Sequence, residues 1–189
     1  MSDARRRVLD TATRLFYAEG VHTVGIDRII AEASVAKATF YHHFKAKDDL
    51  VVAYLVQEFE RQRGLFDEMG RPETGMARIA LIFDALGDHS CGADFRGCPF
   101  LNAAAEFADP AHPVRRVVAE YRAWFRDYMR ALLAEAGRPD DAATAEFLLV
   151  LRDGIAISGG LGDATALRSA IRIGMAAVAE GWAGRSLVG

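Results

Sequence analysis

Residues 25–44 of this chain read GIDRIIAEASVAKATFYHHF, and this stretch decides how the N-terminal part folds. Its first half spaces apolar side chains three and four residues apart, as one face of a short helix requires; these are Ile26, Ile29, Ile30 and Ala33. Residues 34–36 interrupt the pattern, and another short helix is expected from Lys37 to about Phe44. Two short helices joined by a tight turn are typical of a helix-turn-helix unit.

An amphipathic helix precedes this stretch. Its apolar stripe consists of Val8, Ala12, Leu15 and Phe16, and it ends at Gly20. Three helices within about fifty residues match the plan of a helix-turn-helix DNA-binding domain, in which the last helix enters the major groove. We therefore predict a DNA-binding domain over residues 1–50, with a small core of Ile29, Ile30, Ala33, Val35 and Phe40.

The solvent face of the helix that begins at Lys37 suits contact with a DNA duplex. A small side chain such as Ala38 lets a helix approach the base edges, and hydroxyl and imidazole groups can bond to bases or phosphates. Lysines at the start of the next helix gain from the field of that helix N-terminus when they hold a phosphate. The predicted DNA contacts are Lys37, Ala38, Thr39, Tyr41, His42, Lys45 and Lys47.

Residues of this helix and of the segment after it also have ordinary structural alternatives. Phe44 fits the core, Tyr41 fits either the core or a phosphate contact, and each lysine taken singly fits an exposed surface. The pair His42-His43 suggests metal ligation, but adjacent side chains on a helix diverge by about 100° and make a poor chelate. We predict no metal site.

The charge is distributed unevenly along the chain. The net charge is −3, which argues weakly against a DNA-binding protein. Residues 1–50 carry eight Lys/Arg against seven Asp/Glu, a net charge of +1, and the remainder carries fifteen against nineteen, a net charge of −4. A small binding region on an acidic body keeps a local positive surface and limits non-specific adhesion.

The rest of the chain also shows helical patterns, and β-branched residues nowhere alternate with a period of two. Glycine and proline bound the segments, which we expect at about 47–69, 75–87, 99–107, 113–136, 141–159 and 164–182, with a loop over 88–97. The predicted fold class is all-α: an N-terminal three-helix helix-turn-helix domain and a C-terminal helical ligand-binding and dimerisation domain over residues 51–189.

This second domain is rich in aromatic side chains, which are expected either to fill its core or to line a small-molecule pocket between helices. The predicted ligand-binding residues are Phe83, Phe100, Phe107, Tyr121, Trp124, Phe125 and Tyr128. Candidate polar anchors are Arg96, Asn102, Glu106, Arg122 and Arg152. The last two helices carry small residues at three- and four-residue spacing, including Ala156, Gly160, Ala170 and Gly174, which allow close packing in a subunit interface or in an intrachain core.

Two cysteines do not make a disulfide framework, so a reducing cytoplasm is the expected environment. The basic start of the chain leads into an amphipathic helix, and no apolar run approaches the roughly 20 residues that span a bilayer. A soluble, cytoplasmic protein without catalytic residues or cofactors is expected. Cys91 and Cys98 leave one alternative open, a thiol redox sensor or a small helical thiol oxidoreductase.

Residues 25–33, 35–44 and 47–50 together closely resemble the TetR-type (tetracycline-repressor-like) transcriptional regulators. The resemblance implies a homodimer that contacts double-stranded DNA at a palindromic operator and leaves it when a small molecule enters the C-terminal domain. It also implies an interface through about residues 141–182. The chain departs from the family pattern at two positions: Ser34 stands where the turn often has glycine, and Val24-Gly25 replaces the threonine that commonly opens the second helix.

Overall fold

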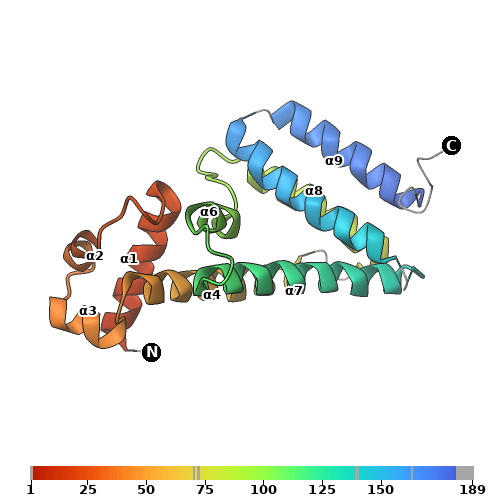
Figure 1. Ribbon diagram of the computed structural model, residues 1–189. Helices are drawn as coiled ribbons and strands as arrows, with labels where there is room; N and C mark the ends of the chain where they lie inside the picture. Colours follow the sequence, from red (N-terminus) through yellow and green to blue (C-terminus); the bar gives the residue numbers. More distant parts are fainter. Residues whose placement is uncertain (1, 70, 72, 139–140, 163, 182–189) are drawn as a thin grey trace. The chain divides into compact units, whose positions relative to one another are not determined.

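The computed structural model describes residues 2–69, 71, 73–138, 141–162 and 164–181 (Figure 1). Over these residues the regular structure is helical throughout, so the predicted all-α fold is confirmed. The helices are α1 (Asp3–Glu19), α2 (Ile26–Glu32), α3 (Lys37–His43), α4 (Lys47–Glu68), α5 (Gly75–Ser90), α6 (Pro99–Glu106), α7 (Pro113–Glu135), α8 (Ala142–Leu161) and α9 (Ala164–Ala179).

The predicted boundaries agree with the observed ones to within two residues at most helix ends. The main difference is α5, which continues to Ser90, although a loop was expected from residue 88. Gly87 lies against α9, where an added Cβ would come 2.7 Å from Ile171 Cδ1. Close packing against α9 thus offsets the helix cost of this glycine, which is about 1 kcal/mol. The last helix was expected to reach residue 182, but α9 ends at Ala179 and residues 180–181 form a turn; residue 182 itself lies outside the described residues.

The chain divides into two compact units, each with its own packing. Residues 1–62 and 99–121 form the first unit, and residues 63–98 and 122–189 form the second. Helices α4 and α7 each contribute residues to both. This division by contacts differs from the division of the sequence at residue 50, which stays a prediction about function.

The first unit is built on α1, α2 and α3, whose apolar faces meet in one core. Of the five predicted core residues, Ile29, Ala33 and Phe40 are buried, and Ile30 and Val35 are half-buried. The core fixes the angle between α2 and α3 and leaves one face of α3 in solvent.

The turn between α2 and α3 requires a left-handed backbone at Ser34, whose φ is +51°. This conformation costs a residue with a Cβ about 1–2 kcal/mol. Replacing Ser34 by glycine, which also loosens the unfolded chain, is therefore expected to raise the free energy of unfolding by about 0.5–1 kcal/mol. Urea denaturation measures the change. The control Ala31→Gly, at an exposed position within α2, should lower the same quantity by about 1 kcal/mol.

The second unit packs α5, α8 and α9 against one another, and Figure 1 shows α8 and α9 side by side. Its core contains Ile79, Ile82, Phe83, Leu148, Leu149, Ile155, Ile171 and Val178. Besides Gly87, two further glycines permit close approach within this unit: a Cβ on Gly159 would lie 2.6 Å from Ser90, and one on Gly174 would lie 3.0 Å from Leu151. Part of the small-residue pattern in the last two helices therefore serves the intrachain core, whereas Gly160 has nothing within 4 Å of such a Cβ.

Candidate nucleic-acid interface

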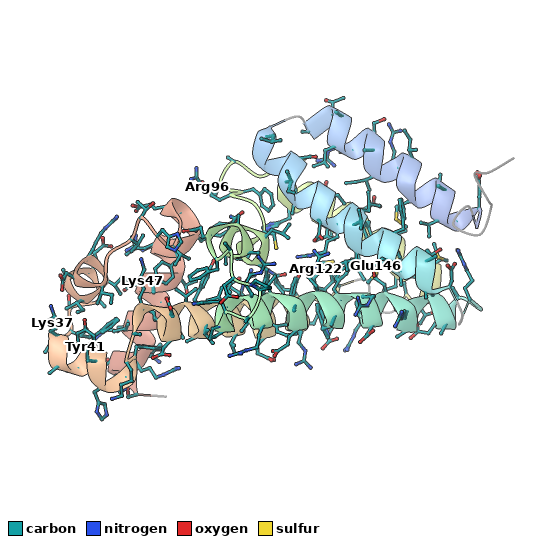
Figure 2. The ribbon with its side chains drawn as sticks, viewed as in Figure 1. Lys37, Tyr41, Lys47, Arg96, Arg122 and Glu146 are labelled. Carbon is teal, nitrogen blue, oxygen red and sulfur yellow. The ribbon has the colours of Figure 1, made fainter. Side chains whose placement is uncertain are left out.

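Helix α3 is held in place by two phenylalanines. Phe40 is fully buried and lies edge-on to Tyr41, with ring centroids 5.2 Å apart, and Phe44 is buried at the C-cap. The predicted core role of Phe44 thus matches its burial. The opposite face of the helix presents Lys37, Ala38, Tyr41 and His42 to solvent, with Thr39 half-buried beside them. Figure 2 labels Lys37 and Tyr41 on this helix.

Lys37 and Asp27 join this exposed face to α2. The Lys37 Nζ lies 3.1 Å from Asp27 Oδ1, and both side chains are exposed. The hydrogen bond to Asp27 raises the pKa of Lys37, so this residue stays charged. Because an exposed ion pair contributes little stability, a DNA phosphate can replace Asp27 as the partner of Lys37.

The two other predicted lysines follow α3. Lys45 is exposed, and its Nζ donates a hydrogen bond to the carbonyl oxygen of Tyr41 at 3.2 Å. Lys47 is half-buried at the start of α4, where burial lowers its pKa and the carboxylates of Glu106 and Asp48 act in the opposite direction. The seven predicted DNA contacts thus lie on α3, in the short segment after it and at the first residue of α4.

Glu106 has a different role from the pocket anchor that the sequence suggested. Its carboxylate accepts hydrogen bonds from the backbone N–H groups of Val21 at 2.8 Å and His22 at 2.5 Å. Its Oε2 also lies 3.4 Å from His22 Nδ1. The C-terminus of α6 therefore holds the loop between α1 and α2, a contact between residues 85 positions apart that no local pattern indicates.

The segment 106–112, which begins at Glu106, also contacts the start of α4. His112 Nε2 lies 3.2 Å from Asp48 Oδ2, next to the predicted phosphate contact at Lys47. The ring of Phe107 lies between the two histidines, with centroids 5.2 Å from His22 and 4.6 Å from His112. Residues 106–112 thus contact the chain just before α2 and at the start of α4.

The other predicted ligand-binding residues of the first unit are packed together. Phe100 and Tyr121 are fully buried and stacked, with ring centroids 3.8 Å apart and planes 5° from parallel. The Tyr121 hydroxyl donates a hydrogen bond to Gln62. Phe59 meets the Tyr121 ring edge-on at 5.4 Å.

In the second unit, Phe83 and Phe125 are fully buried, whereas Trp124 and Tyr128 are half-buried. Phe66 contacts the rings of Trp124, Phe125 and Tyr128, and its carbonyl oxygen accepts a hydrogen bond from the Tyr128 hydroxyl at 2.9 Å. Burial raises the pKa of Tyr128, so this hydroxyl keeps its proton. Whether these aromatic residues contact a ligand stays a prediction.

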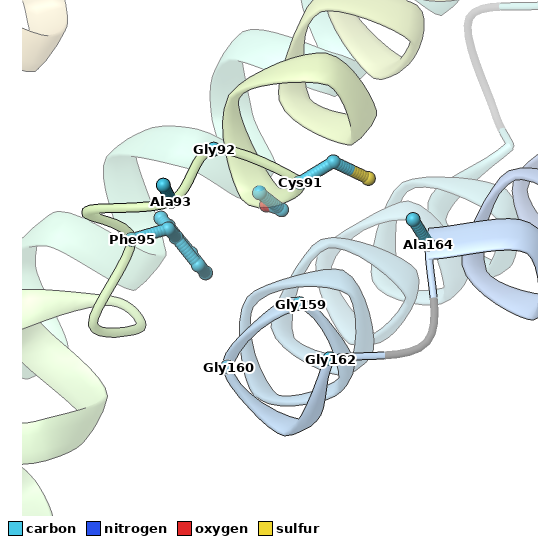
Figure 3. A pocket seen from close by; sticks show the side chains of 9 residues that line it. Cys91, Gly92, Ala93, Phe95, Gly159, Gly160, Gly162 and Ala164 are labelled. Atoms are coloured by element: carbon cyan, nitrogen blue, oxygen red, sulfur yellow. The ribbon is translucent and has the colours of Figure 1, made fainter.

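A pocket of about 300 Å³ in the second unit lies elsewhere, between the end of α5 and the end of α8 (Figure 3). Its lining includes Cys91, Phe95, Gly159 and Ala164, and none of the predicted ligand-binding residues. Cys91 is half-buried and Cys98 is buried; both are free thiols. Arg152 donates a hydrogen bond to the sulfur of Cys98 at 3.1 Å.

Large apolar side chains remain exposed on the last two helices. The exposed fractions are 58% for Val150, 59% for Ile157 and 81% for Leu161 on α8, and 70% for Ile173 on α9. In the described part of the chain, no three His, Cys, Asp or Glu side chains are grouped as a metal site would need. No described helix is both long and apolar enough to cross a membrane.

Two family models match the chain. The model described as "Bacterial regulatory proteins, tetR family" matches residues 8–54, and "Tetracyclin repressor-like, C-terminal domain" matches residues 75–173. The chain is 28% identical over 151 residues to the HTH-type transcriptional regulator LmrA of Bacillus subtilis, covering 75% of this chain and 79% of that protein. It is 33% identical over 64 residues to the regulator UidR of Escherichia coli, covering 34% of this chain and 33% of that protein.

Solved structures share the fold over nearly the whole chain. A TetR-family transcriptional regulator of Streptomyces coelicolor, SCO4454, superposes with a TM-score of 0.87 at 43% sequence identity, covering 94% of this chain and 95% of that chain. A putative TetR-type regulator of Streptomyces avermitilis gives a TM-score of 0.82 at 25% identity, covering 93% and 98%. These matches to transcriptional regulators do not favour the thiol oxidoreductase or thiol sensor that Cys91 and Cys98 had left open.

Proposed function

Because the chain belongs to the TetR family of DNA-binding transcriptional regulators, we propose that it is a homodimeric repressor of the cytoplasm. In this proposal it binds a palindromic operator and leaves it when a small molecule binds the C-terminal helices. Regulators of this family are generally not enzymes, and we assign no catalytic residue and no cofactor.

The observation that carries the proposal is the exposed face of α3. A helix seven residues long would not hold its position alone, but Phe40 and Phe44 fix it to the core of the first unit. Its free face combines a lysine, a phenol and an imidazole with the small Ala38. This combination supports base contacts by the centre of the helix and phosphate contacts at its ends.

The exposed apolar side chains of α8 and α9 support pairing of two copies through these helices. Single exposed apolar residues are common on proteins, but several large ones on two neighbouring helices mark an interaction surface. Two-fold pairing of α8 and α9 would bury Val150, Ile157, Leu161 and Ile173 in a four-helix interface. One α3 from each protomer would then bind one half of the palindrome.

Regulation by a ligand requires a difference in affinity between two shapes of the protein. The aromatic residues named above are the proposed contacts of an apolar small molecule. Helix α4 is continuous from Lys47 to Glu68, so in this proposal it would transmit a shift at the ligand-binding helices to Lys47, at the end of the DNA-binding region.

The proposal is tested by fluorescence anisotropy with duplexes from the promoter region of the protein's own gene, against scrambled duplexes, across a salt series. Selective binding of two protomers, or of a multiple of two, per operator is expected. Equal and weak binding to every native and scrambled duplex would contradict the proposal.

Two substitutions test the assigned phosphate contacts. Tyr41→Phe removes one hydroxyl from each protomer and is expected to weaken operator binding by roughly five- to tenfold per protomer, or about 25- to 100-fold for a dimer, since each protomer loses one hydrogen bond. The slope of log K against log salt is negative, and Lys47→Ala is expected to make it less steep by about 0.9 per protomer, or about 1.8 for a dimer. The control is Arg116→Ala, at an exposed position of α7. Unchanged binding by both variants would refute the assignment of these contacts.

A further inference from the structure

We infer that the first turn of α1 is a second DNA-contact surface, continuous with α3, and that Arg6 and Arg7 bind phosphates bordering the groove that α3 reads. This inference rests on the proposed function. It adds residues that the sequence pattern of a helix-turn-helix does not mark, because Arg5, Arg6 and Arg7 lie outside that motif.

The first observation is that the start of α1 lies beside the end of α3. Ser2, the N-cap of α1, accepts a hydrogen bond from the backbone N–H of Arg5 at 3.2 Å. The same Ser2 Oγ lies 3.1 Å from Nε2 of His43 in the last turn of α3, across 41 positions of sequence. The guanidinium of Arg5 stacks over the Phe44 ring, 5.0 Å from its centroid. These contacts fix the position of the first turn of α1 relative to α3.

The second observation is the charge at this place. Residues 3–7 contain three arginines and one aspartate, a net charge of +2. Arg6 Nη2 and Arg7 Nη1 bind the two carboxylate oxygens of Asp3 at 2.7 Å and 2.8 Å. All three side chains are at least half exposed: 61% for Arg6, 50% for Arg7 and 61% for Asp3. Both guanidinium groups are thus held by one exposed carboxylate that phosphates can replace.

The position of this arginine surface beside α3 indicates which part of the DNA it contacts. The N-terminal residues of a recognition helix contact base edges, and its neighbouring elements contact the backbone. A cationic surface beside the C-terminal end of α3 therefore faces phosphates. Guanidinium groups match phosphate oxygens in both charge and geometry. The surface is thus a phosphate contact continuous with the α3 surface, with Asp3 as the internal competitor of the DNA.

The test compares the double variant Arg6→Ala/Arg7→Ala with wild type on a duplex that the wild-type protein selects from a random pool. The slope of log K against log salt is negative, and it is expected to become less steep by about 0.9 for each phosphate that an arginine no longer binds, up to about 3.6 for the four arginines of a dimer. In ethylation interference, one or two phosphates per half-site that matter for the wild type should no longer matter for the double variant, and the base contacts should remain. Asp3→Asn is expected to change affinity in the opposite direction, toward tighter binding.

Arg14→Ala is the matched control, because Arg14 lies on the same helix, is 63% exposed and also pairs with a carboxylate, that of Glu32. Its salt slope should equal that of the wild type. Equal slopes and equal interference patterns for the double variant and this control would overturn the inference. Thermal unfolding checks that each variant is folded, and Arg6→Gln/Arg7→Gln replaces any alanine variant that is not.

The two proposals fail in different ways. If the wild-type protein binds its selected duplex no better than a scrambled one, the proposed function is wrong. If the wild type is selective and the arginine variant has the same slope, only the inference about α1 is wrong.

Discussion

Replacing Ile157 by arginine is expected to convert the protein to a monomer and to abolish selective operator binding. Ile157 is 59% exposed on α8, so an arginine is tolerated in the isolated chain, but pairing of α8 and α9 would bury its charge. Burying an unpaired charge costs several kcal/mol, which is enough to dissociate a dimer. Each α3 then binds a half-site alone, and the affinity gained from linking two sites, of the order of 10²–10⁴-fold, is lost.

Light scattering coupled to size exclusion measures the mass of the Ile157→Arg variant, and anisotropy measures its operator affinity. Leu81→Arg is the matched control, because Leu81 is also an exposed apolar residue of the second unit but lies on α5. The control should remain dimeric and bind the operator. A dimeric Ile157→Arg protein with full affinity would show that the copies pair through another surface.

Replacing Glu106 by alanine is expected to loosen the loop between α1 and α2 and to weaken operator binding. The carboxylate accepts hydrogen bonds from two backbone N–H groups, those of Val21 and His22. A hydrogen bond to a charged group contributes about 1.5–3 kcal/mol. Because the Glu106 side chain is partly exposed and water can replace it, we expect the free energy that holds the α1–α2 loop in place to fall by only about 1–2 kcal/mol.

Hydrogen exchange locates this effect. The amides of Val21 and His22 should exchange about five- to thirtyfold faster in Glu106→Ala, since about 1.4 kcal/mol corresponds to a factor of ten. The control Glu120→Ala removes an exposed carboxylate of α7 in the same unit and should leave both amides protected. Unchanged exchange at Val21 and His22 would mean that other contacts hold this loop.

Local sequence patterns predicted the helices well, because helix formation depends on spacing, capping and breaking residues within a few positions. The stretch 25–44 specified α2, the turn and α3, and the left-handed φ at Ser34 is what a glycine-like turn position requires. The same periodicity separated the buried Phe40 and Phe44 from the exposed Lys37, whereas it left Tyr41 open between core and surface, and the structure exposes it. Exposure of most predicted DNA contacts therefore follows from the spacing of residues along the chain.

Contacts between distant residues were decided only by the tertiary structure. The sequence suggested Glu106 as an anchor for a ligand, but packing of α6 near the α1–α2 loop gives its carboxylate two backbone amides. Likewise, nothing near Ser2 in sequence indicates His43 as its neighbour. The sequence around a surface residue does not indicate its partner, because the burial of other, apolar residues brings that partner near.

For the same reason, the sequence did not show which aromatic residues of the C-terminal part pack against one another. Their number was plain from the sequence, but the helical pattern that buries an aromatic side chain is the same in a core and in a pocket wall. Packing determined that Phe100 stacks on Tyr121 and that Phe66 joins Trp124, Phe125 and Tyr128. The sequence by itself thus determined the helices and the exposed surface of α3, since both follow from neighbours along the chain. The tertiary structure decided which side chains meet, since such contacts depend on how the helices pack.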